Sequence, residues 1–250
     1  MIGVIKSDNR YEYLSFLLDC IISNELVDFY GIDELLLPFG GIDEYYNIKN
    51  SNINILDILR VNDIKAIYVG VANDKLIDLC EYKNIKLYEI LKDEEFIIDN
   101  AHLTAMGIIN HLSQGEKIIN DYKIVVTGFG YVGYMLCRLL DANKVDFSVY
   151  TTNPIEQKFV KLLGYKITNF QDFSIIINTI PHNIDIDYNL LKNKRIVDVA
   201  SYPYGFDIEK INNMNVRYEI MSEIPDKFCP NLAAHILKKY IEKKQILIYN

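Results

Sequence analysis

One stretch of the sequence, KIVVTGFGYVGYMLCRLL over residues 123–140, constrains the fold more than any other. It reads as a short apolar strand, then a loop with three glycines, then a helix whose apolar residues recur at helical spacing. The loop matches the pattern G-x-G-x-x-G with Gly128, Gly130 and Gly133. A strand, a glycine loop and a helix in this order are typical of the first unit of an open parallel α/β sheet.

Each of these glycines has a separate physical role in such a loop. Gly128 permits the tight turn out of the strand, Gly130 lets the backbone approach a pyrophosphate, and Gly133 lets the helix lie close to the sheet. The helix N-terminus adds free N–H groups and a partial positive charge. The alternative is a glycine turn of the same fold that holds no ligand. We predict a dinucleotide at this loop, which consists of Gly128, Phe129, Gly130, Tyr131, Val132 and Gly133.

The end of the following strand indicates which dinucleotide would bind. An acid about 20 residues after the loop would bond the 2′-OH of the adenosine ribose and repel a 2′-phosphate. The sequence VYTTNP stands there without an acid, and we expect Thr151, Thr152 and Asn153 at the ribose. Asn153 should also cap the helix that begins at Pro154. Because this acid is missing, we favour NADP, with NAD as the alternative. The nearest cation is Lys158, and no Arg is present in this stretch to bind a 2′-phosphate.

Strands and helices alternate along the chain in two series. In the first series, the strand IGVIKS is followed by an expected helix over residues 10–22 and an expected strand over 26–31. The alternation predicts an α/β fold with two Rossmann-like, doubly wound parallel-sheet domains and a cleft between them. We expect a substrate-side domain over residues 1–100, completed by a C-terminal helix over 229–250. Residues 101–228 would form the NAD(P)-binding Rossmann domain.

Composition excludes several classes of function. The net charge of −8, from 34 acidic and 26 basic residues, argues against a general affinity for nucleic acid. No run of about 18 uncharged apolar residues is present, so we expect no membrane span, and the N-terminus does not read as a signal peptide. The four cysteines are far apart, as in cytosolic proteins with reduced thiols. The four histidines lack metal-ligand spacing, and we predict no metal site.

Ligands of open α/β sheets bind outside the carboxyl ends of the strands. In the loop INTIPHN, we expect Asn178, Thr179, Ile180 and Pro181 to border the nicotinamide, the alternative being a simple turn. His182 follows and is the histidine best placed for proton transfer. In the strand RIVDVA, the buried acid Asp198 needs a partner, for which we favour a structural role.

Two basic residues are candidates for contact with an acidic substrate. Lys227, in the loop MSEIPDKFCPN, could bind a carboxylate or donate a proton, and a solvated surface lysine is the alternative. Arg10 follows the first strand and could bind an anion, with an ordinary surface role as the alternative.

The order of the motifs TGFGYVG, NTIP, DVAS-P-G-D and IPDK--PNLAAHIL resembles the dipicolinate synthase family, in particular its Rossmann-type A component. The stretch DNAHLTAMGIINHL, with Thr104 and Gly107 on the family motif, is similar as well. The resemblance implies a cytoplasmic protein of a spore-forming bacterium that uses NADP to oxidise a dihydrodipicolinate-level precursor to dipicolinate in sporulation. It also implies a dicarboxylate substrate, with Thr104 and Ser201 as further candidates for substrate contact, and a partner in the form of a flavoprotein-like B subunit. We further expect a homo-oligomer.

Several positions depart from the family pattern. The chain has Met106 where the family tends to have an acid, and Asn231 where it has a Lys. Tyr202 and Tyr204 replace Arg and Gly in the family's Arg-Pro-Gly-Gly loop. The loss of basic groups would weaken the binding of a dicarboxylate. Two alternatives therefore stay open, another small-acid dehydrogenase on the same scaffold and a non-catalytic NAD(P)-binding subunit.

Overall fold

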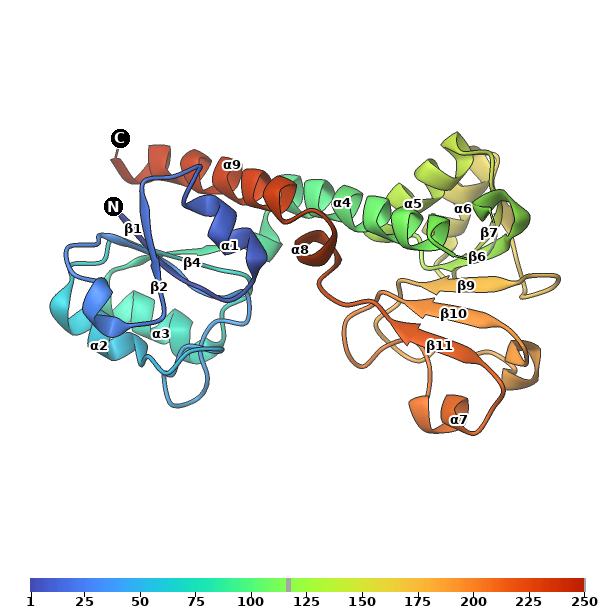
Figure 1. Cartoon of the computed structure of the whole chain (residues 1–250), viewed down its shortest axis with the longest axis horizontal. Coiled ribbons are helices and arrows are strands. Elements are labelled where there is room, and N and C mark those ends of the chain that lie inside the picture. The colour runs from blue at the N-terminus through green and yellow to red at the C-terminus, as the bar shows by residue number, and fades with distance from the viewer. Residues whose placement is uncertain (116–117, 250) are drawn as a thin grey trace. The chain divides into compact units, whose positions relative to one another are not determined.

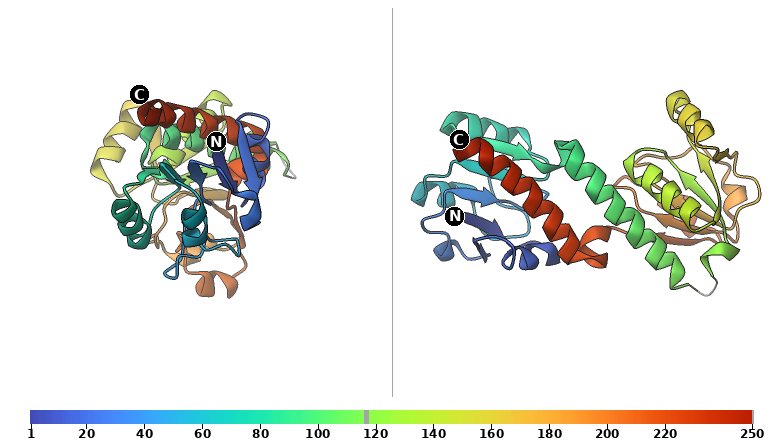
Figure 2. Two further views of the ribbon diagram at one scale, coloured as in Figure 1. Left: turned by 90° about the vertical axis from the view of Figure 1, so that its left-hand side faces the viewer. Right: turned by 90° about the horizontal axis from the view of Figure 1, so that it is seen from above.

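The computed structural model describes residues 1–115 and 118–249, and the chain divides into two compact units. The first unit comprises Met1–Asn100 together with Pro225–Asn250, and the second comprises Ala101–Ile224. Both ends of the chain therefore belong to the first unit (Figures 1 and 2). The helix α4 (Glu94–Ser113) crosses one boundary between the units.

The first unit is built on a parallel sheet with the strand order β2-β1-β3-β4-β5. All of its strand pairs among the described residues are parallel. This order is that of flavodoxin-like doubly wound sheets, in which the strand order reverses between β1 and β3. The strands are β1 (Ile2–Ile5), β2 (Cys20–Ser23), β3 (Glu34–Leu36), β4 (Ala66–Val69) and β5 (Lys86–Glu89).

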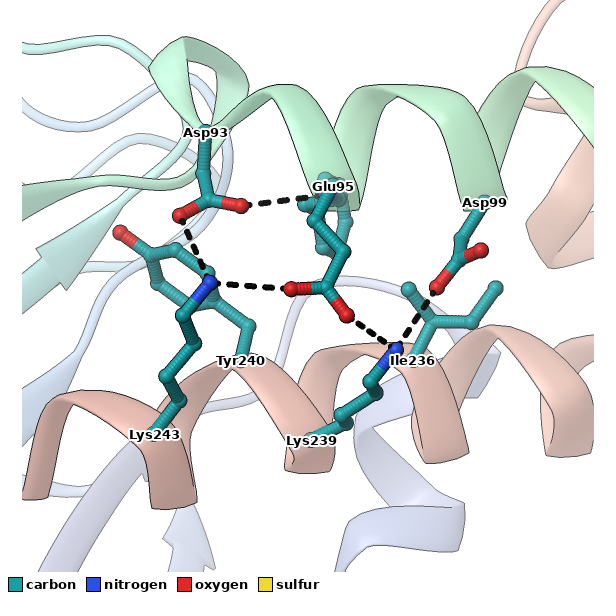
Figure 3. A pocket seen from close by; sticks show the side chains of 8 residues that line it. Asp93, Glu95, Asp99, Ile236, Lys239, Tyr240 and Lys243 are labelled. Atoms are coloured by element: carbon teal, nitrogen blue, oxygen red, sulfur yellow. Dashed lines mark hydrogen bonds and ion pairs between the residues drawn. The ribbon is translucent and has the colours of Figure 1, made fainter. Parts of the chain in front are cut away.

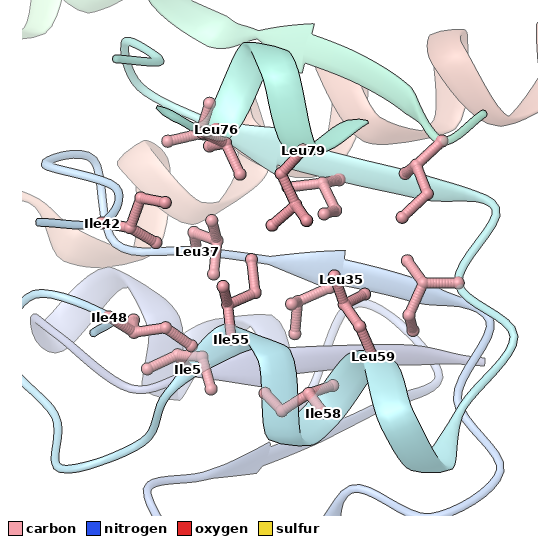
Figure 4. Packing of buried hydrophobic residues seen from close by; sticks show 14 of the residues in the cluster. Ile5, Leu35, Leu37, Ile42, Ile48, Ile55, Ile58, Leu59, Leu76 and Leu79 are labelled. Carbon is pink, nitrogen blue, oxygen red and sulfur yellow. The ribbon is translucent and has the colours of Figure 1, made fainter. Parts of the chain in front are cut away.

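Helices cover both faces of this sheet. Leu35 and Leu36 are neighbours in β3, and their side chains belong to separate apolar clusters because successive residues of a strand face opposite ways. The cluster that contains Leu35 packs under α2 and α3 (Figure 4). The cluster that contains Leu36 includes Leu14 of α1 and Leu237 of α9. The remaining elements are α1 (Asn9–Leu14), η1 (Leu26–Asp28), α2 (Ile55–Val61), α3 (Asp74–Lys83), η2 (Ile90–Lys92), α8 (Ile224–Phe228) and α9 (Pro230–Tyr249).

Two expectations for this unit are wrong. The helix expected over 10–22 ends at Leu14, and Cys20, Ile21 and Ile22 form the edge strand β2 in parallel register with β1. The sheet offers these residues backbone hydrogen bonds and an apolar neighbour, and β-branched residues fit a pleated, half-buried surface. The strand expected over 26–31 is instead a 3₁₀ turn over Leu26–Asp28.

The C-terminal helix α9 is held to the first unit by apolar and charged contacts. Lys239 and Lys243 of α9 both pair with Glu95 at the start of α4, Lys243 with a distance of 2.9 Å (Figure 3). Exposed ion pairs of this kind contribute little individually. Leu237 and Tyr240 are buried in the cluster against β1 and β3, and their burial therefore holds the helix more strongly.

The second unit is built on a parallel sheet with the strand order β11-β10-β9-β6-β7-β8. With the six strands renumbered 1 to 6 from β6 to β11, the order read from the β8 edge is 3-2-1-4-5-6. This is the arrangement of dinucleotide-binding Rossmann domains. The predicted fold class, two parallel-sheet α/β domains, is confirmed. The strands are β6 (Lys123–Thr127), β7 (Asp146–Tyr150), β8 (Lys166–Ile167), β9 (Ile175–Asn178), β10 (Arg195–Asp198) and β11 (Arg217–Ile220).

The central strands of the second sheet are buried on both sides. All four residues of β9 are buried, as expected for the apolar run in the middle of a parallel sheet. On one face Ile176 and Ile196 pack with Phe206 and Ile211. Within the residues that the structure describes, no helix is long and apolar enough to cross a membrane. The other elements are η3 (Ile119–Asp121), α5 (Tyr131–Ala142), α6 (Pro154–Leu162), η4 (Tyr188–Leu191) and α7 (Ile208–Asn212).

Candidate functional site

The strand order of the second sheet reverses between β6 and β9, which lie side by side. Thr127 at the end of β6 pairs in register with Asn178 at the end of β9. The glycine loop 128–133 and the loop 179–182 therefore both start from this edge of the sheet. In open α/β sheets the crevice at such a reversal is the usual ligand site.

Two of the three glycines are enclosed by protein atoms. Gly128 has a φ of +86°, and a Cβ there would lie 2.6 Å from Thr179 Oγ1. A Cβ at Gly133 would lie 2.3 Å from the carbonyl oxygen of Gly128. The start of α5, the glycine loop and the loop after β9 are thus in close contact, which excludes a side chain at either position.

Gly130 is in the opposite situation. It precedes α5 with a φ of −71°, which any residue can adopt. Its own chain neighbours and helix backbone aside, no heavy atom of the described residues lies within 4 Å of a Cβ built there. The first N–H groups of α5 begin beside this open space and have no intrahelical partner. A diphosphate fits such a position because it can approach the backbone and accept these N–H groups.

The end of β7 contacts the glycine loop through an acid. The hydroxyl of Thr151 donates to Oε2 of Glu156 at 2.5 Å, and the N–H of Phe129 donates to the same oxygen at 3.2 Å. Glu156 lies in the first turn of α6 and is half-buried. Its carboxylate therefore joins the glycine loop to the first residue after β7.

Asn153 caps α6, as predicted, because its side-chain oxygen accepts the N–H of Ile155 at 2.9 Å. Thr151 is buried and accepts the N–H of Asn153, whereas Thr152 is exposed. The predicted ribose contacts thus lie together at the start of α6.

Glu156 is the residue of this site that sequence reasoning missed. Glu156 lies two residues beyond the sequence VYTTNP, which contains no acid. An available signal was the spacing of Asn153 and Glu156, since an acid three residues after a helix cap commonly folds back on the residues before the helix.

A pocket of about 560 Å³ lies beside the glycine loop, between α5 and α6. Most of its lining is aromatic or aliphatic, and the ring of Phe129 meets that of Tyr134 edge-on at 5.7 Å. The lining residues are Phe129, Gly130, Tyr131, Tyr134, Glu156, Phe159 and Leu163.

Asn178 is buried, and its amide forms four hydrogen bonds. Its oxygen accepts from the Thr127 hydroxyl at 2.6 Å and from the N–H of Ile180 at 3.0 Å. Its nitrogen donates to the carbonyl of Ile180 at 3.0 Å and to Asp198 at 2.8 Å. These bonds use the full capacity of an amide, so Asn178 fixes the path of the loop after β9. A Cβ at Gly205 would lie 2.3 Å from this amide.

The structural role expected for Asp198 is confirmed. Its carboxylate is buried and accepts from Asn178, from the N–H groups of Ala200 and Gly205 at 3.1 and 3.0 Å, and from the Tyr218 hydroxyl at 3.0 Å. Burial and the neighbouring Asp198 raise the pKa of Tyr218, which keeps this hydroxyl a donor. The network fixes the loops after β9 and β10 relative to each other.

The remaining residues of the loop after β9 face outward to different degrees. Thr179 is partly buried, and its hydroxyl donates to the carbonyl of Thr127 at 2.7 Å. Ile180 is also partly buried, whereas Pro181 and His182 are exposed. His182 forms no hydrogen bond or ion pair with the residues that the structure describes.

The first unit brings Arg10 and Lys227 into one region. Asp226 of α8 is buried and accepts the backbone N–H of Arg10 at 3.2 Å, and Lys227 is the next residue of that helix. The Arg10 side chain is buried, with Nε 3.0 Å from Asp8 and the guanidinium carbon 4.5 Å from the centre of the Phe39 ring. Arg10 is therefore an internal ion-paired residue beside the reversal of the first sheet, while Lys227 is exposed.

The other candidates and departures lie in the following places. Thr104 is buried and Met106 is half-buried, both on α4. Ser201 and Tyr202 are exposed in the loop after β10. In that loop Tyr204 has a φ of +69° at the position where the family has Gly. Asn231 is exposed on α9. No cluster of His, Cys, Asp or Glu suited to a metal ion occurs among the described residues.

The fold is that of D-2-hydroxyacid dehydrogenases. A D-isomer specific 2-hydroxyacid dehydrogenase from Lactobacillus delbrueckii ssp. bulgaricus, in its NAD-complexed form, is similar with a TM-score of 0.54 and 11% identity over 99% of this chain and 97% of that one. More specifically, the chain resembles the A component of dipicolinate synthase, as the motifs indicated. The structure of that protein from Bacillus halodurans has a TM-score of 0.78 and 21% identity, with 100% of this chain and 98% of that one covered.

The sequence comparison agrees with this resemblance. The A component of dipicolinate synthase from Bacillus subtilis (strain 168) is 20% identical over 234 residues, which cover 87% of this chain and 79% of that protein. No family model matches the chain. The structural resemblance extends through the first unit as well, since it covers the full length of the chain.

Proposed function

We propose that the chain is an NAD(P)-dependent oxidoreductase of the dipicolinate synthase A type. The observation that carries the proposal is the open backbone at Gly130, placed at the strand reversal of a 3-2-1-4-5-6 sheet beside the N-terminus of α5. The likeness to dehydrogenases, of which one is an NAD complex, supports it.

The residues present fit a dinucleotide. The loop from Gly128 to Gly133 would hold the pyrophosphate, and Thr151, Thr152 and Asn153 would lie at the adenosine ribose. Thr179, Ile180 and Pro181 would border the nicotinamide, with Asn178 holding their loop in place. The nicotinamide supplies the hydride acceptor, and the protein supplies binding and orientation.

For the substrate we propose a small cyclic dicarboxylate at the dihydrodipicolinate level, oxidised to dipicolinate in the cytoplasm of a sporulating cell. Loss of a hydride to the nicotinamide and of a proton to a base would remove two hydrogens and aromatise the ring. His182 and Lys227 are the candidates for the proton transfer, and both are exposed. Arg10, Thr104, Ser201 and Lys227 are the candidates for substrate contact.

A second candidate is a different small-acid dehydrogenase on the same scaffold. The observation that favours it is the exposed Tyr202 in the loop after β10, where the family has an Arg. An aromatic ring there would suit a substrate with an apolar part better than a second carboxylate. A panel of hydroxy and amino acids, assayed for cofactor reduction, separates the two substrates.

The test of the proposed function begins with cofactor binding. NADH and NADPH should each be titrated against the purified chain. Binding should enhance or quench the nicotinamide fluorescence, and the saturation of this signal gives the dissociation constant. Gly130→Val should weaken this binding at least tenfold, because its side chain would fill the space beside the first N–H groups of α5. Its unfolding midpoint should stay close to that of the wild type. Apart from the chain neighbours of Gly130 and the adjoining helix backbone, no described heavy atom lies within 4 Å of a Cβ at that position.

The second step of the test is turnover. The chain, alone and together with a flavoprotein-like B subunit, should reduce the cofactor when supplied with the dihydrodipicolinate precursor. Binding without turnover on any substrate would instead identify a non-catalytic NAD(P)-binding subunit. Equal affinity of the wild type and Gly130→Val would contradict the dinucleotide site itself. Size-exclusion chromatography of the same samples tests the proposed homo-oligomer.

A further inference from the structure

We infer that the carboxylate of Glu156 makes this site select NAD over NADP. The inference rests on the proposed dinucleotide site and specifies which cofactor that site takes. It concerns a residue outside the glycine pattern, brought to the site by the start of α6.

The carboxylate of Glu156 is hydrogen-bonded at the place where Rossmann domains recognise the adenosine ribose. That place is the end of the second strand, about 20 residues after the glycine loop. Here the strand is β7, and the first residue after it is Thr151. Thr151 is neutral, but its hydroxyl holds Oε2 of Glu156 at 2.5 Å. The Phe129 N–H within the glycine loop holds the same oxygen at 3.2 Å. The carboxylate of Glu156 therefore places a negative charge at the end of β7, although β7 itself ends without an acid.

The second oxygen of this carboxylate is available to a ligand. Among the described residues, no donor is hydrogen-bonded to Oε1 of Glu156, and no Lys or Arg forms an ion pair with this residue. Glu156 also lines the pocket beside the glycine loop. A carboxylate that has no cationic partner, and one oxygen without a protein donor, can accept a hydrogen bond from a ribose hydroxyl.

The two cofactors differ at the atom that such a carboxylate would meet. The ribose of NAD offers a 2′-OH, which is a donor. NADP carries a phosphate there, with close to two negative charges at neutral pH. Like charges at a few ångströms repel strongly near a protein surface. Site selectivity of this kind comes from a repulsive element against the wrong ligand as much as from contacts to the right one.

A purely structural role is the competing explanation. Glu156 could serve only to tie α6 to the glycine loop through its two hydrogen bonds. A glutamine at this position can still accept both bonds, because its side-chain oxygen replaces Oε2, but it carries no charge. Glu156→Gln therefore separates the effect of the charge from the effect of the contacts.

The experiment measures dissociation constants of NADH and NADPH for the wild type, Glu156→Gln and a control. The control is Glu209→Gln, which removes the same charge from the first turn of α7, where the side chain is exposed. We expect the wild type to bind NADH more tightly. Glu156→Gln should lower the ratio of the NADPH constant to the NADH constant by roughly tenfold. Glu209→Gln should leave the ratio unchanged.

A measurement on the wild type supports the test without any variant. If the selectivity arises from charge repulsion, raising the salt concentration should reduce the ratio of the two constants, since salt screens exposed charges. The inference is overturned if the wild type prefers NADPH, or if Glu156→Gln leaves the ratio unchanged while both cofactors bind. Failure of both cofactors to bind the wild type would overturn the proposed function, and the inference with it.

Discussion

Gly130 and Gly133 stand three residues apart in one motif, yet they should respond oppositely to an added methyl group. At Gly133 a Cβ would lie 2.3 Å from the carbonyl oxygen of Gly128, which is backbone and cannot turn away. At Gly130 the same atom meets open space. Gly133 therefore serves the packing of the protein, and Gly130 leaves room for a ligand.

Gly133→Ala should accordingly destabilise the protein by about 1–3 kcal/mol, the usual cost of overpacking. Gly130→Ala is the matched control and should change the free energy of unfolding by less than about 1 kcal/mol. Urea denaturation followed by circular dichroism gives both values. Similar losses for the two variants would show that the loop is not packed as described.

Asn178 shows how burial changes the role of a polar residue at the end of a strand from a candidate ligand contact to a structural one. From the sequence, a polar side chain after an apolar strand is a candidate ligand contact. In the structure its amide is fully used by Thr127, Ile180 and Asp198. The residues of this loop that are exposed to solvent come later in the sequence than Asn178.

At the scale of elements, one cluster joins the end of α4 to the second sheet. Arg195 Nε of β10 lies 2.5 Å from Glu219 of β11, and His111 Nε2 of α4 lies 3.1 Å from the same carboxylate and 2.9 Å from Arg195 Nη2. Burial raises the pKa of Glu219, but the hydrogen bond and charge of Arg195 and the charge of His111 lower it more. Its pKa therefore lies below the ordinary value of 4.5.

This lowered pKa predicts a pH dependence of stability. A carboxyl whose pKa is lower in the folded state contributes stability above its unfolded pKa, and the contribution is lost as the pH falls through the folded value. Glu219→Gln should thus lower the free energy of unfolding by about 1–2 kcal/mol at pH 7. The difference from the wild type should shrink below pH 4.5. Unfolding curves at pH 7 and at lower pH check this, with Glu209→Gln as the exposed control. A difference that grows on acidification would contradict the assigned pairing.

The element scale also shows where local patterns mislead. The apolar residues between Tyr13 and Ile22 have helical spacing, but the chain leaves the helix after Leu14 and returns as the edge strand β2. The pairing partner of β2 is β1, whose residues lie 18 positions earlier, and the local sequence does not reveal that contact. In long segments such as α9, the helical periodicity of the apolar residues predicts the element without knowledge of its tertiary contacts.

At the scale of the whole molecule, the first unit is assembled from both ends of the chain. Residues of β1 and β3 share an apolar cluster with Leu237 of α9, although more than 200 residues separate β1 from this helix. The first unit can therefore be completed only after α9 has been synthesised.

Leu237→Ala should reveal this dependence. Leu237 is fully buried, and its truncation should lower the free energy of unfolding by about 2–5 kcal/mol through lost burial and the cavity left behind. Leu247→Ala on the same helix is the control, because Leu247 is 61% exposed and should change stability little. Denaturant unfolding measures both. Equal effects of the two substitutions would mean that α9 does not complete the first core.

Local sequence was enough to predict the alternation of strands and helices, the glycine loop and the cap of α6. These features depend on residues that are neighbours along the chain, so propensity, periodicity and turn chemistry suffice to predict them. Other features became visible only in the folded chain. Glu156 reaches the glycine loop, Asn178 and Asp198 hydrogen-bond each other, and residues 20–23 form a strand. Each of these depends on contact between segments that are distant in the chain, and such contacts arise only when the sheet is assembled.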